Sequence, residues 1–366
     1  MLRLHLRACI LSLIFLSNTA LSATFTVNTI ADGPDANPGN GICATAGGVC
    51  SLRAAIMEAN TTAAADTISL PKGTYLLTEV GASEDSGLTG DLDIFYPLTI
   101  NGAKTTETII DGLGLDRIFH VRLVGSLTLT NATLTNGFLS DPGGAIYSET
   151  MNELSVSKVN CIGNFGDAGG ALFSNGPLTV SYSLFENNSA STGGALFRSG
   201  PGSVSITHST FRNNAAASIG AVFVTTDSTT TISDCVFEGN TASSIASIYL
   251  TNSSANNSEI TNTAFLDNAS PSIGAFYYSG NGPISFTDCS FTNNHSDSDI
   301  GGGMYITAPE LSITRSTFSN NFGNAGAADV FFNSTGGNFS FIDSTSMNPE
   351  CGSGTGCSLY VAGTGP

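Results

Sequence analysis

Short segments in which every second residue is apolar recur along most of the chain. Examples are LTVS from Leu178, VSIT from Val204, ISFT from Ile284 and LSIT from Leu311. This alternation, rich in β-branched residues, is typical of strands that bury one face. After each segment come a short bend, the motif Phe-x-x-Asn, and small residues that lead into a further strand, such as GGALF from Gly169. The pattern predicts three strands in each repeat.

The Phe-x-x-Asn motif sets the period of the repeat. Its six copies begin at Phe185, Phe211, Phe237, Phe265, Phe291 and Phe318, in steps of 26, 26, 28, 26 and 27 residues. A period in this range marks a solenoid, in which each unit buries its apolar face by stacking on the next. We therefore predict an all-β fold, a single-stranded right-handed parallel β-helix with three strands per coil and about eleven coils over residues 66–345.

Stacked coils place equivalent side chains in columns along the axis. The six motif phenylalanines are expected to form one column inside the core. A second aromatic column is expected beside the third strand, from Tyr147, Phe173, Phe197, Phe223, Tyr249, Tyr277 and Tyr305. The motif asparagines predict a ladder, because a buried amide needs partners that the next coil can supply. Its members are Asn188, Asn214, Asn240, Asn268, Asn294 and Asn321. Binding of a glycan by these asparagines is the less favoured alternative, since they repeat so regularly at a corner.

Residues 1–23 have the features of a secretory signal. A basic start with Arg3 and Arg7 precedes a short apolar core and small residues at the expected cleavage site. That core is shorter than the roughly 20 residues needed to span a bilayer, and no later segment is long enough, so no transmembrane span is expected. Without this segment the chain holds nine basic and 29 acidic residues, a net charge of −20. Such a surface repels phosphate backbones, which argues against nucleic acid as a partner.

Both ends of the predicted β-helix need a cover, because open strand edges invite end-to-end stacking of molecules. Residues 24–65 are expected to form an N-terminal cap with a disulfide loop and a helix. Ser51 is the predicted N-cap of that helix, with Leu52, Ala55, Ile56 and Ala59 on one face. Residues 346–366 are expected to form a C-terminal loop or cap.

The cysteines predict local disulfides near the two ends of the chain. Cys43–Cys50 and Cys351–Cys357 are close in sequence and suit an oxidising compartment. Cys235 and Cys289 occupy one repeat column two coils apart, about 9.6 Å at strand spacing, beyond the disulfide limit of about 6.8 Å. Together with Cys161 they are expected to be buried free thiols.

Two family resemblances follow from these motifs. The stretch Phe25–Asn60, which contains CSLRAAIMEAN, resembles the N-terminal motif of bacterial CSLREA-type exported proteins. The GGA[I/L] and Phe-x-x-Asn pair is similar to the repeats of chlamydial-type polymorphic outer-membrane proteins, which are surface adhesins. The resemblance implies a secreted or cell-surface bacterial protein, outer-membrane associated, that acts without catalysis in adhesion or association with a glycan or a host or cell-surface protein. The alternative is a polysaccharide lyase or inverting glycoside hydrolase, because the pectin-lyase-like superfamily shares this fold.

The candidate catalytic residues lie three positions before the motif phenylalanines. They are His208, Asp234, Asp288 and Arg315, in one column with Tyr182 and Asn262. Asp234 and Asp288, two coils apart, would lie near the roughly 6.5–9.5 Å separation of inverting glycosidases. The favoured alternative is a solvated bend that accepts any polar side chain, because a fold does not by itself confer a function.

Calcium is the one cofactor that the sequence suggests. Asp32, Asp35, Asn37 and Asn40 in DGPDANPGNG offer hard oxygen ligands. The favoured alternative is an Asn/Asp/Gly/Pro turn cluster. Weaker acidic pairs, for which solvated loop acids are the favoured interpretation, are Asp91 with Asp93 and Asp297 with Asp299. A structural role is expected for His120.

Overall fold

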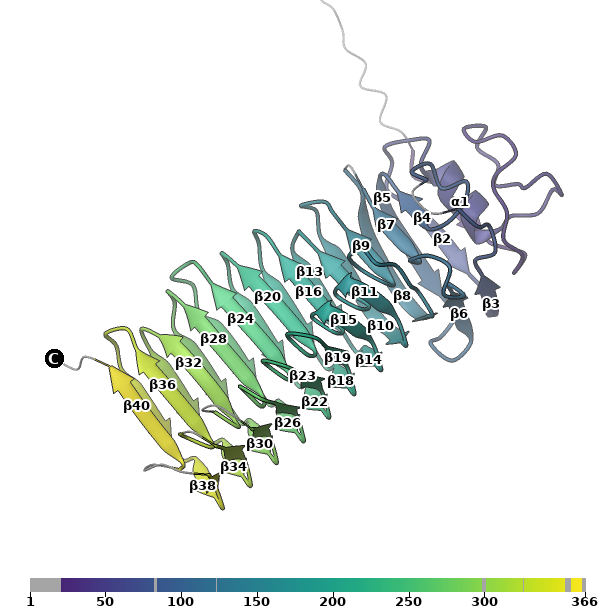
Figure 1. The fold of residues 1–366 in the computed structure, drawn as a ribbon. Coiled ribbons are helices and arrows are strands. Elements are labelled where there is room, and N and C mark those ends of the chain that lie inside the picture. The colour runs from purple at the N-terminus through teal and green to yellow at the C-terminus, as the bar shows by residue number, and fades with distance from the viewer. Residues whose placement is uncertain are drawn as a thin grey trace, which may run out of the picture.

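The chain folds into an elongated stack of coils in which every strand pairing is parallel (Figure 1). The computed structural model describes residues 21–81, 84–122, 124–297, 301–324, 326–352 and 357–363. The described part is nearly all β with a single helix, so the predicted β-helix is confirmed. The predicted signal segment lies outside the described residues except for residues 21–23.

Sheet A has 21 strands and is bent, because most coils contribute two successive strands to it. Its strands are β1 (Thr24–Thr26), β2 (Asp66–Leu70), β3 (Gly73–Leu76), β5 (Pro97–Gly102), β6 (Thr108–Asp111), β8 (Ser126–Thr135), β10 (Leu154–Ile162), β13 (Leu178–Ser181), β14 (Leu184–Glu186), β17 (Val204–Thr207), β18 (Thr210–Arg212), β21 (Thr230–Ser233), β22 (Val236–Glu238), β25 (Ser258–Thr261), β26 (Ala264–Leu266), β29 (Ile284–Thr287), β30 (Ser290–Thr292), β33 (Leu311–Thr314), β34 (Thr317–Ser319), β37 (Phe339–Ile342) and β38 (Thr345–Met347).

Sheets B and C complete each coil. Sheet B has 11 strands and sheet C has 8. Sheet B contains β4 (Leu92–Ile94), β7 (Phe119–Val121), β9 (Ile146–Ser148), β12 (Leu172–Ser174), β16 (Leu196–Ser199), β20 (Val222–Thr226), β24 (Ile248–Asn252), β28 (Phe276–Gly280), β32 (Met304–Ala308), β36 (Val330–Ser334) and β40 (Leu359–Gly363). Sheet C contains β11 (Phe165–Ala168), β15 (Ser189–Thr192), β19 (Ala215–Ala216), β23 (Thr241–Ala242), β27 (Ala269–Ser270), β31 (His295–Ser296), β35 (Phe322–Gly323) and β39 (Glu350–Cys351).

Most coils therefore contain four strand segments in three sheets. The first two, such as β13 and β14, are both in sheet A and meet at a residue in the left-handed region, where Tyr182 has φ 50° and His208 has φ 48°. A single left-handed residue turns the chain while the strands on both sides keep their neighbours in the next coil. The strands of sheet C are only two to four residues long, which is too short for an alternation pattern to reveal them.

The predicted aromatic column fills the core. The six motif phenylalanines are fully buried, and their rings stack with centroids 4.6–5.2 Å apart and planes within 9° of parallel. The second column is also continuous but lies on the outer face of sheet B, where its rings are half-buried. Its position follows from the strand period, since Leu196 points inward and Phe197 must then point outward.

The asparagine ladder is confirmed and has one more member, Asn164. In each coil the side-chain Nδ2 donates to the Oδ1 of the next asparagine at 2.9–3.1 Å. The second Nδ2 hydrogen is donated to a backbone carbonyl, as from Asn214 to Phe185. The same Oδ1 also accepts the backbone N–H of the preceding asparagine, as Asn240 does from Asn214. Every buried amide is thus satisfied by neighbouring coils.

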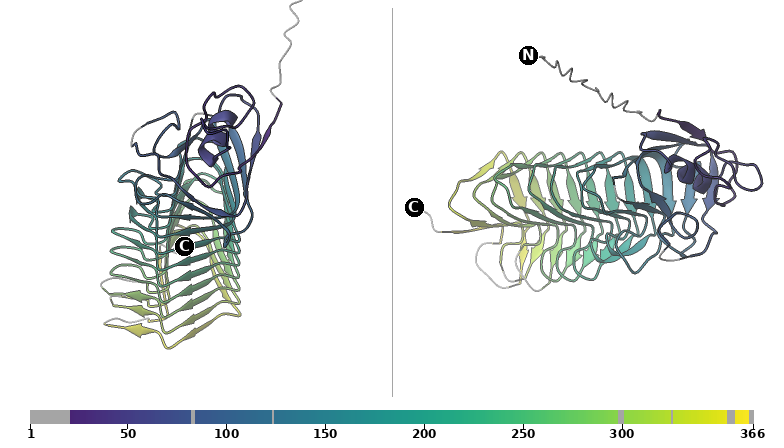
Figure 2. Two further views of the ribbon diagram at one scale, coloured as in Figure 1. Left: turned by 90° about the vertical axis from the view of Figure 1, so that its right-hand side faces the viewer. Right: turned by 90° about the horizontal axis from the view of Figure 1, so that it is seen from above.

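The N-terminal cap is built around helix α1 (Leu52–Ala59), at one end of the stack (Figure 2). Ser51 accepts a hydrogen bond from the Ala54 N–H, as an N-cap does. The helix is buried on all sides, including Arg53, whose guanidinium binds the Asp32 carboxylate at 2.9 and 3.1 Å. Cys43 and Cys50 form the predicted disulfide in the loop before it.

At the other end, strands β38, β39 and β40 continue all three sheets beyond residue 345, the predicted end of the β-helix. Ser346 pairs with Phe318 and stands where the motif has phenylalanine, so the sequence pattern hides this last coil. The predicted Cys351–Cys357 disulfide lies between β39 and β40. Cys161, Cys235 and Cys289 are free and buried, as expected.

Candidate functional site on the outer face of sheet B

A continuous row of rings runs along the outer face of sheet B. It begins at His120 and continues through Tyr147, Phe173, Phe197, Phe223, Tyr249, Tyr277, Tyr305, Phe331 and Tyr360, with ring centroids 4.3–5.6 Å apart. Most neighbouring rings are stacked, so each ring covers the face of the next. Ile219, Ile245 and Ile273 pack against the central rings from one side. The row therefore offers ring edges and tyrosine hydroxyls, while the ring faces are largely covered.

A second outward row consists of short polar side chains two residues after the rings. Ser199, Thr225, Thr251, Ser279, Thr307 and Asn333 pair in register from coil to coil. Beside this row lies an open groove of about 690 Å³ that crosses six coils parallel to the long axis. Its lining is rich in hydroxyl, amide and backbone groups, and Asp227 is the one ionisable side chain among the described residues that line it.

A buried arginine supports one wall of this groove. The Arg198 side chain points inward from β16 and is fully buried. Its guanidinium donates to five backbone carbonyls, those of Gly176, Gly200, Pro201, Gly202 and Thr225. Burial lowers the pKa of Arg198 to about 10, which leaves it charged at neutral pH. The arginine thereby holds the loop at residues 200–202 against the end of sheet B.

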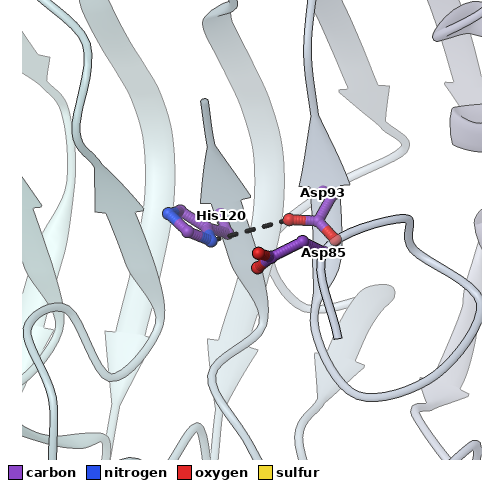
Figure 3. Close-up of side chains that lie close together, drawn as sticks. All are labelled: Asp85, Asp93 and His120. Carbon is purple, nitrogen blue, oxygen red and sulfur yellow. Dashed lines mark ion pairs between the residues drawn. The ribbon is translucent and has the colours of Figure 1, made fainter. Parts of the chain in front are cut away.

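The N-terminal end of the same face carries a buried group of charged residues. In register, Asp93 pairs with His120, and His120 pairs with Tyr147. His120 Nδ1 lies 3.5 Å from Asp93 Oδ1, and His120 Nε2 lies 3.6 Å from Glu149 Oε2. Asp85 reaches the same place from the loop before β4 (Figure 3). The sequence favoured solvated loop acids for Asp91 and Asp93, but both are buried because this loop folds over them.

Arginines and burial control the charge of this group. Arg117 Nε lies 2.5 Å from Asp91 Oδ2, and Arg122 Nη1 lies 2.5 Å from Asp85 Oδ1. Burial raises the pKa of Asp91 to about 7 against the effect of Arg117. Burial likewise raises the pKa of Asp93 to about 7, with Asp91 adding to the shift. For His120, burial lowers the pKa to about 3, so its imidazole is neutral.

The four candidate catalytic residues lie in one exposed row along the bend of sheet A, and each has a positive φ. Their charged side chains pair with one another or with a neighbouring polar side chain. Asp234 accepts a 2.6 Å bond from Asn262 and lies 3.7 Å from His208, while Arg315 donates to both oxygens of Asp288 at 2.8 and 2.7 Å. These hydrogen bonds hold the pKa of Asp234 and of Asp288 below the usual range. An inverting glycosidase needs one protonated acid, and lowered pKa values oppose that role.

Three of the four suggested calcium ligands, Asp32, Asp35 and Asn40, accept hydrogen bonds from protein donors. Asp32 accepts from Arg53 and from the backbone N–H groups of Thr78 and Glu79. Asp35 accepts from the N–H groups of Asn37 and Ala44, and Asn40 Oδ1 accepts from the N–H of Ile42. These contacts favour the alternative, a turn cluster held by its own hydrogen bonds. Of the weaker acidic pair Asp297 and Asp299, Asp297 lies 2.7 Å from His295 at the surface, and Asp299 lies outside the described residues.

Comparison with known proteins adds no family to this picture. The chain matches no protein-family model, and no curated protein matches it. Within the described residues, the one helix is too short to cross a membrane.

Proposed function

We propose that this chain is an exported, non-catalytic solenoid that binds a neutral, hydroxyl-rich linear polymer such as a glycan along the groove beside sheet B. The observation that carries the proposal is the groove of about 690 Å³ across six coils, lined by a regular row of short hydroxyl side chains. The coils repeat at about 4.8 Å, so the same donors and acceptors recur along the axis, as a polymer with a regular repeat requires.

The charge of the groove supports a neutral ligand. The chain has a net charge of −18, yet within the part that the structure describes Asp227 is the only acid that lines the groove. Asp227 also accepts a 2.9 Å hydrogen bond from the Gly202 N–H. A polyanion would be repelled by the acidic molecule, whereas an uncharged glycan meets hydroxyl and amide groups in the groove.

The same lining supports a role without catalysis. Glycoside hydrolysis generally uses two carboxylates on either side of the scissile bond, and no second acid joins Asp227 among the described residues of the groove lining. Export is supported by the two disulfides, which form in oxidising compartments. Adhesion at a cell surface is the role that such binding would serve.

A glycan array and co-sedimentation with insoluble polysaccharides test this proposal. Thr251→Arg places a bulky charge in the groove and should reduce binding at least tenfold. Thr261→Arg makes the same change on the outer face of sheet A in the same coil, where Thr261 is half-exposed like Thr251, and should leave binding unchanged. Equal loss in both variants, or depolymerisation of the bound glycan, would contradict the proposal.

A further inference from the structure

Three side chains from separate parts of the N-terminal coils converge on one point. Asp85 comes from the loop before β4, Asp93 from β4 and His120 from β7, and each offers a ligand atom within 4.8 Å of the others. Figure 3 shows the two carboxylates and one imidazole nitrogen directed toward a common space. We propose that this group binds a divalent first-row transition-metal ion of the Zn²⁺ class. The proposal does not depend on glycan binding in the groove.

The spacing of the donor atoms suits a metal ion better than a hydrogen bond. Asp93 Oδ1 and His120 Nδ1 are 3.5 Å apart. An N–H···O hydrogen bond is usually about 2.7–3.2 Å long. Two ligands on a tetrahedral zinc ion, each about 2.1 Å from the metal, lie about 3.4 Å apart.

A second observation concerns the hydrogen bonds of the Asp93 carboxylate. Asp93 is completely buried, and its Oδ1 has no hydrogen-bond partner among the residues that the structure describes. The other oxygen, Oδ2, accepts a 3.0 Å bond from the Gly87 N–H, which fixes the orientation of the carboxylate. A buried carboxylate oxygen without a donor is unfavourable, and a cation at this point would satisfy it.

His120 is arranged as a metal ligand with a supporting carboxylate. Its Nδ1 faces Asp93, and its Nε2, which has no hydrogen bond within the described part of the chain, lies 3.6 Å from Glu149 Oε2. A small movement would let Nε2–H donate to Glu149 and hold Nδ1 unprotonated toward the metal, as carboxylate–histidine–zinc triads do. Stacking on Tyr147 at 4.9 Å restricts the ring to this orientation.

The local charge also favours a divalent cation. Asp85, Asp91, Asp93 and Glu149 lie near two guanidiniums: Arg117 pairs with Asp91, and Arg122 lies 2.5 Å from Asp85 and 3.9 Å from Asp93. Arg122 therefore competes with a metal for Asp85, and it can retain Glu149, 3.4 Å away, when the metal binds. Asp85 is solvent-exposed, which leaves a side open for entry of the ion and for a water ligand.

The chemistry of the ligands defines the class of ion. One imidazole with two carboxylates suits Zn²⁺ and neighbouring first-row ions, whereas Ca²⁺ takes six to eight oxygen ligands. A bound ion would link the loop at residues 84–91 to the first two strands of sheet B. We therefore expect it to stabilise the N-terminal end of the solenoid.

The test uses the full chain exported to an oxidising compartment, stripped with EDTA and dialysed. Calorimetric titration with Zn²⁺ should give one equivalent per chain and a higher melting temperature. Co²⁺ in place of Zn²⁺ should give the visible absorption of a low-coordinate site with oxygen and nitrogen ligands. Asp93→Asn, His120→Gln and the exposed-side variant Asp85→Asn should each weaken Zn²⁺ binding at least tenfold.

His208→Gln is the matched control, because His208, like His120, lies close to an aspartate. Its Nε2 is 3.7 Å from Asp234, but this pair is exposed. It should leave Zn²⁺ binding unchanged. Absence of stoichiometric binding, or equal weakening in the control, would overturn the proposal. Unchanged affinity for Zn²⁺ in Asp85→Asn, the variant that disturbs the core least, would also overturn the proposal. Equal stabilisation of the chain by Ca²⁺ and by Zn²⁺ would do the same.

Discussion

Asn321 Nδ2 donates a 2.9 Å hydrogen bond to Asp329 Oδ1, and this contact ends the asparagine ladder. In each preceding coil the side-chain amide of the equivalent asparagine donates to the asparagine of the following coil, as Asn294 does to Asn321. Asp329 takes that place, and its Oδ2 accepts a hydrogen bond from the Ser346 hydroxyl. Burial raises the pKa of Asp329 above its ordinary value, against the effect of Ser346 and Asn321. The last rung of the ladder is therefore sensitive to pH.

Asp329→Asn should reduce the loss of stability with rising pH. Because its pKa is raised on folding, Asp329 holds its proton more firmly in the folded chain. It therefore contributes stability at low pH that is lost as pH rises through its ordinary value near 3.8 and then through the higher folded value. Asparagine keeps an oxygen acceptor for Asn321 and cannot ionise, so the variant should be at least as stable as the parent at pH 7.

Urea denaturation between pH 4 and pH 8 measures this difference. Asp343→Asn makes the same change at an exposed aspartate in a neighbouring part of the chain and serves as the control. A parent-like slope in Asp329→Asn would show that Asp329 does not cause the pH dependence, and a clear loss of stability at pH 7 would show that the carboxylate is needed in its charged form.

Asn240→Ala should destabilise the centre of the ladder. Asn240 Oδ1 accepts from the Asn214 side chain, and its Nδ2 donates to the Phe211 carbonyl and to Asn268. Alanine leaves these buried groups without partners, at about 1–3 kcal/mol for each unsatisfied group, so we expect a loss of about 3 kcal/mol or more. Chemical denaturation measures it. Asn257→Ala removes an exposed hydrogen bond to Glu259 and should change stability by less than about 0.5 kcal/mol; a similar small change in Asn240→Ala would contradict the role of the ladder.

Arg198→Met should destabilise the fold and distort the groove. Methionine fills much of the volume but donates nothing to the five carbonyls that Arg198 now satisfies. We expect a loss of about 3 kcal/mol or more in the free energy of unfolding, since several buried acceptors become unpaired. Arg212→Met removes a surface ion pair with Glu186 and should cost about 1 kcal/mol or less. Equal losses would mean that the carbonyl contacts of Arg198 contribute little.

The three buried thiols should be unreactive in the native protein. Burial raises the pKa of Cys161 and Cys235 to about 12 and that of Cys289 to about 11, so almost no thiolate forms at neutral pH. A thiol reagent should label none of them natively and all three in denaturant. Rapid labelling of folded protein would indicate local opening of the coils.

The repeat pattern was enough to predict the architecture. When the coils stack, residues at equivalent positions of successive repeats lie one above another. Phe211 and Phe237 lie 26 residues apart and one strand spacing apart in space, so their stacking could be predicted from the period alone. The same holds for the asparagine ladder. Where the motif is missing, as at Ser346, the sequence predicts an end to the β-helix although the backbone continues to pair.

The charged group at the N-terminal end could not be predicted in this way. Asp93 and His120 lie in strands of the weak early repeats, and their pairing depends on the register of β4 with β7. The site also depends on the loop that carries Asp85 and Gly87, because the Gly87 N–H donates to Asp93 and Asp85 lies beside Asp93 and His120. Contacts that recur between successive coils give a repeated pattern in the sequence. A loop that covers a single coil gives no such pattern.

The sequence alone thus determined which residues stack inside the solenoid, because a constant period admits one solution for burying the apolar face of each unit. Only the tertiary structure decided which outward residues meet. The outer groove, the Arg198 support and the convergence of Asp85, Asp93 and His120 all depend on loops whose paths are set by contacts between residues far apart in the chain.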